Sequence, residues 1–310
     1  MKFVMPRAEW RAGYRQLHEA GELAERVEAA RELLSPCRLC PRECGVDRLK
    51  GERGVCRVLD RPVLSSYGPH FGEEDVLVGR GGSGTIFMAY CNLGCVYCQN
   101  WDISQNGEGQ EVNEEQLARI MLSLERRGCE NINVVTPTHV MPFVLGALNL
   151  AAREGLSLPF VYNCGGYESL AALEVLDGVV DVYMPDMKYG EGEAGRKYSG
   201  VRDYHVHNRR ALKEMHRQVG DLVVDEEGRA LRGLIIRHLV LPDGLAGTRE
   251  VMEFIAREIS RDSYVNIMSQ YRPAYRAWRY PELGRRVTSA EYAEAVETAR
   301  KAGLWRLETD

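Results

Sequence analysis

Two kinds of hydrophobic pattern alternate along the chain from residue 85 onward. Short, nearly continuous apolar runs predict strands, and longer segments with apolar residues at helical spacing predict helices between them. Strands that are apolar on both faces and alternate with helices are typical of a parallel sheet covered by helices. The predicted strands are TIFMAY (85–90), INVVT (132–136), PFVYN (159–163), VVDVYM (179–184), LIIRHLVL (234–241) and YVNIM (264–268).

The number of strand–helix units decides which architecture such a sheet adopts. Six units fit a partial (β/α)6 barrel of the TIM type better than a closed eight-fold barrel, so the predicted fold class is α/β. A hairpin predicted at 221–233 precedes the fifth strand. Helices are predicted near 114–127, 141–154, 169–176, 204–218, 249–261 and 289–302.

The amino-terminal part of the chain follows a different pattern. Apolar residues recur at helical spacing from Trp10 to Leu34, and Gly21 divides this stretch into two helices. Residues 37–57 carry cysteines, are rich in Arg and Gly, and show no clear period. The glycine-rich GRGGSG (79–84) lacks the lysine and spacing of a phosphate-binding loop and is interpreted as a turn. These breaks predict helices in 1–36, a cysteine-rich extension in 37–82 and the barrel in 83–310.

Length and composition are those of a folded protein with its own core. The 310 residues are 45% hydrophobic and 27% charged, which excludes wholesale disorder. The net charge of -5 argues against a bulk polyelectrolyte binder but leaves room for a local basic patch. The start, MKFVMPRAEWR, lacks the apolar core of a signal peptide, and the apolar run near 141–152 is too short to cross a bilayer. We therefore expect a cytoplasmic protein without a membrane partner.

The nine cysteines are the most informative residues of the sequence. They form a group of four, a group of three and two isolated residues, Cys129 and Cys164. In a reducing compartment, grouped cysteines more often bind metal than form disulfides, and the odd total argues against a complete disulfide framework. The two isolated cysteines are interpreted as small buried apolar residues.

The group of three follows the first predicted barrel strand in the sequence CNLGCVYC. Cys91, Cys95 and Cys98 have the spacing C-x3-C-x2-C. Three thiolates on one loop can hold three corners of an iron–sulfur cube and leave one iron free to bind a small chelating molecule. The alternative is a zinc site with a fourth ligand elsewhere, but structural zinc loops usually come as C-x2-C pairs.

CNLGCVYC resembles the signature of the radical S-adenosylmethionine (SAM) superfamily, and the resemblance extends over about 85–305. It points in particular to the glycyl-radical activating enzymes, in a branch named after the pyruvate formate-lyase activating enzyme. The resemblance implies that Cys91, Cys95 and Cys98 hold a [4Fe–4S] cluster whose fourth iron binds the methionyl amine and carboxylate of SAM. It also implies that Tyr97 lies near the adenine.

Two motifs at later strand ends extend the resemblance. MPDMK (184–188) resembles the family's M-x-D-x-K, which implies that Lys188 binds the cofactor carboxylate and that Met184 and Asp186 line a monovalent-cation site. NCGGY (163–167) stands where the activase has an Asp-Thr-Asn-Gly stretch. This placement implies that Asn163 and Cys164 face the same cation.

The fifth strand and two loops supply the remaining predicted contacts with SAM. RHLVLP (237–242) resembles Arg-x-Val-Val-Val-Pro, which implies that Arg237 meets the cofactor carboxylate or ribose. TPTH (136–139) replaces the family's Gly-Gly-Glu, and Gln270 follows the sixth strand. All these positions lie at carboxyl ends of predicted strands, where α/β barrels form their active sites. The further cofactor contacts implied are Leu239 and Leu241 against adenine, Thr136, Thr138 and His139 at the methionyl amine, and Gln270.

Structural alternatives stand beside these roles. Asp186 and Lys188 also fit a solvated loop, and a lone histidine such as His139 is more often a satisfied core or loop residue. Arg237 lies in a very apolar strand, where a buried charge needs a partner.

The group of four cysteines lies in the extension, with the spacing C-x2-C-x3-C-x11-C. Four thiolates suffice to close a tetrahedral zinc site or to hold a second iron–sulfur cluster, and spacing does not choose between them. Neighbouring arginines would offset the thiolate charge. The alternative is a reduced cysteine loop without metal. The residues of this group are Cys37, Cys40, Cys44 and Cys56.

A basic and aromatic stretch, QYRPAYRAWRYPELGRR (270–286), interleaves arginines with tyrosines and a tryptophan. Such a stretch can stack bases and neutralise phosphates, so RNA is a candidate partner. It can also line a cavity for a peptide or glycyl loop, or close the barrel with its arginines in solvent.

The resemblance implies an enzyme that reductively cleaves SAM to a 5′-deoxyadenosyl radical, which abstracts hydrogen from a glycyl residue of a partner enzyme. Such chemistry requires an electron donor such as flavodoxin or ferredoxin. One alternative is a radical SAM enzyme that modifies RNA, a peptide or a small molecule. Another is a non-catalytic iron–sulfur electron carrier, which would not need Asp186, Lys188 and Arg237 around an open iron.

Overall fold

A single, mostly parallel sheet organises the molecule. The computed structural model describes residues 2–309, and its 10-stranded sheet has the order β10-β9-β8-β6-β5-β4-β2-β1-β3, with β7 paired to β8. The strands from β2 to β10 along this path are parallel, which gives an open barrel. The predicted partial α/β barrel is therefore confirmed. The strands are β1 (Val63–His70), β2 (Ser83–Met88), β3 (Gln110–Glu111), β4 (Ile132–Val135), β5 (Phe160–Cys164), β6 (Val182–Pro185), β7 (Val223–Val224), β8 (Ala230–Leu239), β9 (Tyr264–Met268) and β10 (Arg306–Thr309).

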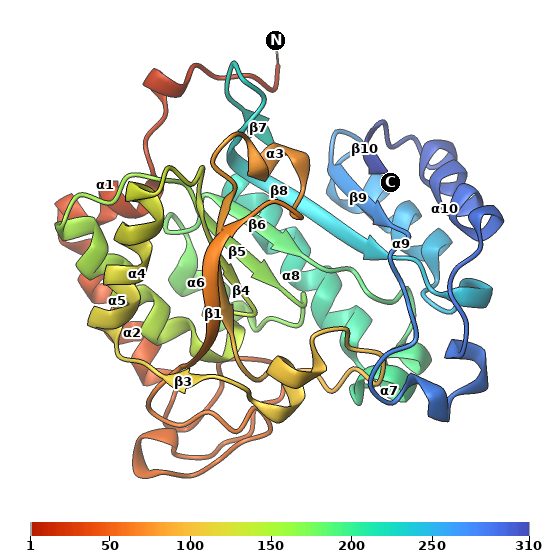
Figure 1. Ribbon diagram of the computed structural model, residues 1–310, viewed down its shortest axis with the longest axis horizontal. Coiled ribbons are helices and arrows are strands. Elements are labelled where there is room, and N and C mark those ends of the chain that lie inside the picture. The colour runs from red at the N-terminus through yellow and green to blue at the C-terminus, as the bar shows by residue number, and fades with distance from the viewer. Residues whose placement is uncertain (1, 310) are drawn as a thin grey trace.

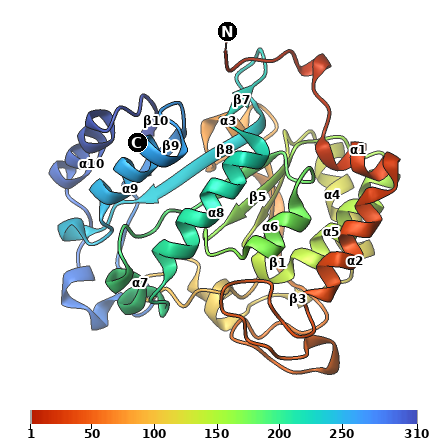
Figure 2. The ribbon, with the colours of Figure 1, turned by 180° about the vertical axis from the view of Figure 1, so that it is seen from behind.

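Helices follow the parallel strands and cover the outer face of the sheet (Figure 1). Figure 2 shows α6 and α8 crossing the back, with α1 and α2 at the flank beside α5. Within residues 2–309 no helix is long and apolar enough to cross a membrane. The helices are α1 (Gly13–Ala20), α2 (Glu22–Glu32), α3 (Asp75–Val78), α4 (Glu114–Arg126), α5 (Met141–Arg153), α6 (Leu170–Leu176), α7 (Gly192–Ser199), α8 (Tyr204–Val219), α9 (Thr248–Phe254) and α10 (Ser289–Lys301).

Most predicted elements are present. The elements that the sequence did not predict are short or have weak apolar patterns. Gly21 separates α1 from α2 in the left-handed conformation (φ 81°), which glycine adopts at little cost. The predicted hairpin forms between β7 and β8. The sequence analysis missed β1, α3, β3, α7 and β10. β1 contains polar residues, a glycine and a proline, and it is held by antiparallel pairing with β2.

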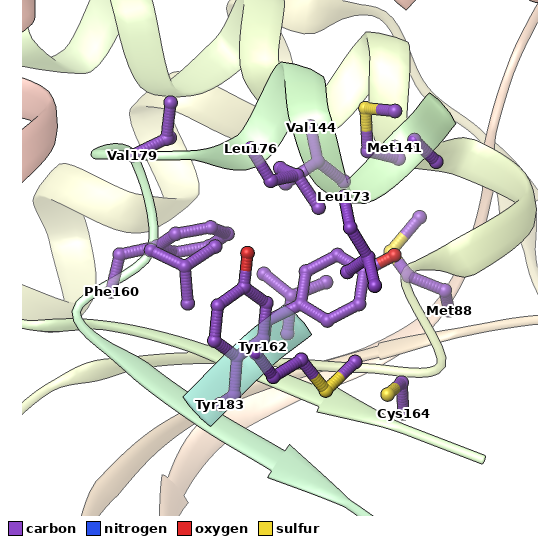
Figure 3. Close-up of a cluster of buried hydrophobic side chains, with 14 of the residues drawn as sticks. Met88, Met141, Val144, Phe160, Tyr162, Cys164, Leu173, Leu176, Val179 and Tyr183 are labelled. Carbon is purple, nitrogen blue, oxygen red and sulfur yellow. The ribbon is translucent and has the colours of Figure 1, made fainter. Parts of the chain in front are cut away.

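The core between the sheet and its helices is large and aromatic. Tyr162 and Tyr183 pack edge to face, with ring centroids 5.8 Å apart, beneath side chains of α5 and α6 (Figure 3). Cys164 lies in this cluster and is 2% exposed, as expected for a small apolar residue. Cys129 is also buried, and both cysteines are free. Because Cys164 faces the core, the next residue back along β5, Asn163, faces the other side of the sheet.

Helix α8 holds the loops after β5 and β6 together at the carboxyl ends of the strands. The Asn208 amide donates hydrogen bonds of 2.9 Å to the carbonyls of Gly166 and Asp186. The Tyr204 hydroxyl lies 2.9 Å from the same Asp186 carbonyl and accepts a bond from the Lys188 amide. These contacts fix the backbone that carries Asp186 and Lys188.

We expect Gly166→Ala to destabilise the protein more than Gly228→Ala does. Both glycines have positive φ, +72° and +82°, so both substitutions introduce backbone strain. At Gly166 the new methyl would also lie 2.2 Å from the Asp186 carbonyl oxygen, whereas nothing lies within 4 Å at Gly228. Overpacking of this kind costs about 1–3 kcal/mol, so the urea midpoint should fall further for Gly166→Ala. Equal midpoints for the two variants would contradict this prediction.

Candidate active site

A cavity of about 620 Å³ opens inside the barrel and at the carboxyl ends of its strands. Its walls include residues of β2, β4, β5, β8, β9 and β10 and part of residues 91–98, which we call the cluster loop. Inward-facing side chains from several neighbouring strands meet there, as is usual for α/β barrels. The predicted site residues that line it are Cys95, Tyr97, Cys98, Asn163, Asp186, Lys188, Arg237, Leu239 and Gln270.

The sulfurs of the cluster loop are surrounded by hydrogen-bond donors. The amide of Leu93 donates to Cys91 Sγ at 3.4 Å. The Ser199 hydroxyl lies 2.9 Å from Cys95 Sγ, and the Ser104 hydroxyl lies 3.1 Å from Cys98 Sγ. Donors of this kind stabilise thiolates and tune the potential of a bound cluster.

The chemistry and spacing of this loop fit an iron–sulfur cluster. Burial raises the pKa of the Cys91 and Cys95 thiols, and the Lys188 ammonium opposes the rise at Cys95. Metal ligation removes such protons outright. Among residues 2–309, no group of three or more Cys, His, Asp or Glu side chains is placed to hold a single metal ion. In a cubane each thiolate binds a different iron, so its ligands stand farther apart than the ligands of one ion.

A row of alternating charges crosses the cavity beside the cluster loop. Asp186 accepts from Lys188 Nζ at 2.5 Å and from Arg237 Nε at 2.9 Å. Burial acts to raise the pKa of Asp186, but the two cations together hold it below its ordinary value. Arg237 also donates to Asn163 Oδ1 at 2.9 Å. The four side chains thus form one network, and its two cations can receive the carboxylate of a bound cofactor.

Acidic residues that the sequence analysis missed form another part of the cavity wall. Glu74 is 3% exposed and accepts from Asn266 at 3.0 Å, while its Oε2 atom is buried without a partner. Burial raises the pKa of the neighbouring Glu73. Both precede β2, in the segment assigned to the extension, so no strand end marked them as site residues. They give this part of the cavity acceptors for a hydrogen-bond donor or cation.

A buried chain of hydroxyls connects the aromatic wall of the cavity to the cluster loop. Tyr97 and Tyr189 hydroxyls lie 2.7 Å apart, and Tyr189 and Ser199 hydroxyls lie 2.7 Å apart. Ser199 in turn contacts Cys95. The Tyr97 ring packs edge to face on Tyr271 with centroids 5.9 Å apart. Tyr97 is therefore rigidly placed in the cavity wall, and its contact with the adenine remains a prediction.

Other predicted cofactor contacts do not line this cavity. Thr138 donates to Glu168 at 2.7 Å, and His139 Nε2 contacts the Ala89 carbonyl at 2.8 Å. Leu241 belongs to a buried aromatic cluster, and Thr136 ends β4 with a positive φ of 61°. The roles predicted for these four residues at SAM remain predictions.

The predicted monovalent-cation site also remains a prediction. Both carboxylate oxygens of Asp186 are engaged by Lys188 and Arg237. Met184 and Cys164 are buried in the core.

The fold, the cavity and the cluster loop are those of a radical SAM enzyme. The chain belongs to the Radical SAM superfamily, whose sequence profile matches residues 85–309. Membership implies a [4Fe–4S] cluster and SAM as cofactors. The chain is 36% identical over 289 residues to the uncharacterized protein MJ0674 of Methanocaldococcus jannaschii, and this match covers 90% of the chain and 78% of that protein.

Solved structures show the same fold at low sequence identity. Streptococcus suis SuiB bound to S-adenosylmethionine aligns with a TM-score of 0.50 and 15% identity over 71% of this chain. HydG, a maturase of the [FeFe]-hydrogenase, aligns with a TM-score of 0.50 and 14% identity over 73% of this chain. The alignments cover 48% and 50% of those proteins, so this chain spans about half their length. These matches do not distinguish the glycyl-radical activating branch.

We expect Lys188→Ala to weaken SAM binding by the reconstituted protein. A lost charge-assisted hydrogen bond is worth about 1.5–3 kcal/mol, or roughly ten- to a hundred-fold in Kd. Lys213→Ala removes an exposed lysine that pairs with Glu258 on the outer helices and serves as the control. Calorimetry should show weaker binding for Lys188→Ala alone, and equal affinity in both variants would place Lys188 outside the binding site.

Proposed function

We propose that this radical SAM enzyme binds SAM across the cavity and cleaves it reductively. The observation that carries this proposal is the shared cavity: Cys95 and Cys98 line the same space as the cations Lys188 and Arg237. The reduced cluster, when bound, supplies one electron to the SAM sulfonium, which yields methionine and a 5′-deoxyadenosyl radical that abstracts hydrogen.

The residues of the chain bind and orient the cofactor. Lys188 and Arg237 offer charge-assisted hydrogen bonds to its carboxylate, and Asp186 holds both cations in place. Tyr97 and Leu239 provide an apolar wall that excludes water from the reacting groups. A cavity with this paired cation row argues against a simple electron carrier, which has no use for a small-molecule site beside its cluster.

Reconstituted, reduced protein should convert SAM to 5′-deoxyadenosine under anaerobic conditions. Each of Cys91→Ala, Cys95→Ala and Cys98→Ala removes one of only three protein ligands and should abolish the product. Cys129→Ala changes a buried cysteine outside the cluster loop and should retain activity. Chromatography of the product measures the outcome, and undiminished turnover in any of the three loop variants would refute the assignment.

We further propose a glycyl residue of a partner polypeptide as the hydrogen donor. The resemblance to activating enzymes supports this choice, and the basic aromatic segment 270–286 offers a surface beside the cavity. The backbone amide of Arg276 donates to the Val96 carbonyl at 2.8 Å, which connects the segment to the cluster loop. Tyr275 stacks on Trp101 with centroids 5.7 Å apart, and Trp278 is 71% exposed.

Charge favours a polypeptide over RNA in the cavity itself. The exposed arginines of segment 270–286 suit either a polypeptide or RNA, so the choice between the two substrates rests on the charge of the cavity lining. Besides Asp186, which is paired with Lys188 and Arg237, the lining includes four acidic residues, and a phosphate backbone entering the cavity would meet like charge. These residues are Glu73, Glu74, Asp75 and Glu308.

Isotope transfer distinguishes the two substrates. Polypeptides made with α-deuterated glycine should pass one deuterium per turnover into 5′-deoxyadenosine, as measured by mass spectrometry. Deuterium transfer from labelled RNA, with none from labelled polypeptides, would overturn the glycyl proposal. In that case 5′-deoxyadenosine would still form, so a failure of the glycyl proposal is distinguishable from a failure of SAM cleavage.

A further inference from the structure

The four cysteines of the amino-terminal extension converge on one small pocket. Although up to 19 positions separate them in the sequence (Cys37 to Cys56), all four line the same cavity. The loops that carry them lie at the bottom of Figures 1 and 2, at the end of the molecule opposite α3 and β7. Cys37 and Cys56 are buried, while Cys40 and Cys44 are half-buried. The fold therefore brings together the residues that the spacing singled out.

A backbone amide donates to one of these sulfurs, as in the cluster loop. The Val55 amide donates to Cys44 Sγ at 3.5 Å, as the Leu93 amide does to Cys91 Sγ at 3.4 Å. A donor of this kind stabilises a thiolate ligand.

Polar and cationic side chains complete the lining of the pocket. His139 lines it, is 1% exposed, and uses Nε2 to contact the Ala89 carbonyl. Burial lowers the pKa of His139 to about 4, so its neutral ring adds no charge beside the cysteines. Arg42 and Arg48 also line the pocket and supply positive charge to offset thiolates.

The arrangement fits an iron–sulfur cluster better than zinc. The pocket that the four cysteines line holds a void of about 10 Å³, which admits one water-sized sphere. Four sulfurs about 2.3 Å from one zinc ion would leave no such void between them. A void lined by the four cysteines suits a cluster in which each thiolate binds its own iron.

We propose that Cys37, Cys40, Cys44 and Cys56 bind a second [4Fe–4S] cluster, which receives the electron from a small carrier protein and passes it to the cluster held by Cys91, Cys95 and Cys98. Four thiolates leave no open iron, so this cluster does not bind SAM.

One side chain connects the two sites. Asn92 lines the pocket of the extension together with Cys40, and its Oδ1 lies 3.8 Å from Cys91 Sγ. It is 1% exposed and fixed by a 2.8 Å bond to the Tyr167 carbonyl. One electron moves from the reduced flavin or iron–sulfur centre of a flavodoxin- or ferredoxin-type carrier to the outer cluster and then to the inner one. No bond breaks and no proton is transferred in this step.

Metal analysis tests the second cluster directly. The reconstituted wild-type protein should contain about eight irons and eight sulfides, against about four of each for a single cubane. Cys40→Ser with Cys44→Ser should lower both to about four, whereas Cys129→Ala should leave them unchanged. A wild-type protein with about four irons, or with zinc at the extension, overturns the proposal.

A second variant keeps the test valid if the extension does not fold without its cysteines. The triple variant Cys91→Ala, Cys95→Ala and Cys98→Ala should retain about four irons and the electron paramagnetic resonance signal of one reduced cubane. Loss of all iron in that variant would contradict a separate site. This outcome does not depend on SAM cleavage, so it is distinguishable from a failure of the proposed function.

The relay role is tested by changing the electron source. With Cys40→Ser and Cys44→Ser, 5′-deoxyadenosine formation should persist with dithionite and fall at least ten-fold with reduced flavodoxin or ferredoxin. In the wild-type protein the two reduced clusters should broaden each other's paramagnetic resonance signals. Equal rates with both reductants in the variant would overturn the relay role.

Discussion

The pairing of Asp186 with Lys188 and Arg237 is the constraint on which the active site depends. Three charges lie half-buried in a barrel wall, and each would be costly there without its partners. The arrangement solves this problem with one anion between two cations, and α8 fixes the backbone of the anion from behind. Because both cations are already held in position, they offer an incoming carboxylate donors that need little reorganisation.

Buried charges with fixed partners also attach the extension to the barrel. Arg48 is 1% exposed, and its guanidinium donates to the carbonyls of Leu59 and His139. Arg42 donates to the carbonyls of Asn92 and Gly200. Two arginines from the cysteine-rich loops thus satisfy carbonyls within the extension, in the cluster loop, in the turn before α5 and after α7. The extension is therefore part of the active-site scaffold and not a separate appendage.

Sequence patterns predicted the parts of this structure that depend on local chemistry. The parallel strands followed from apolar runs, and the cysteine spacing predicted the cluster loop that now lines the cavity with Asp186, Lys188 and Arg237. Contacts between distant segments left no such signal. Glu74 reaches the cavity only because β1 pairs with β2 and α3 folds inward. Likewise, nothing in the sequence around His139 indicates that this residue lines the pocket of the extension and not the cavity beside the cluster loop.

The open edge of the sheet has a consequence for how the enzyme controls a reactive species. The sheet ends at β10 on one side and at β3 on the other, so the barrel does not close upon itself within the described chain. A closed barrel admits only what passes through its mouth, whereas an open one can be approached from the side by a folded macromolecule. The polypeptide substrate that we propose would then complete the wall of the reaction chamber. Protection of the radical from solvent would be a property of the complex, and selectivity for the correct partner would also protect the enzyme from damage by its own radical.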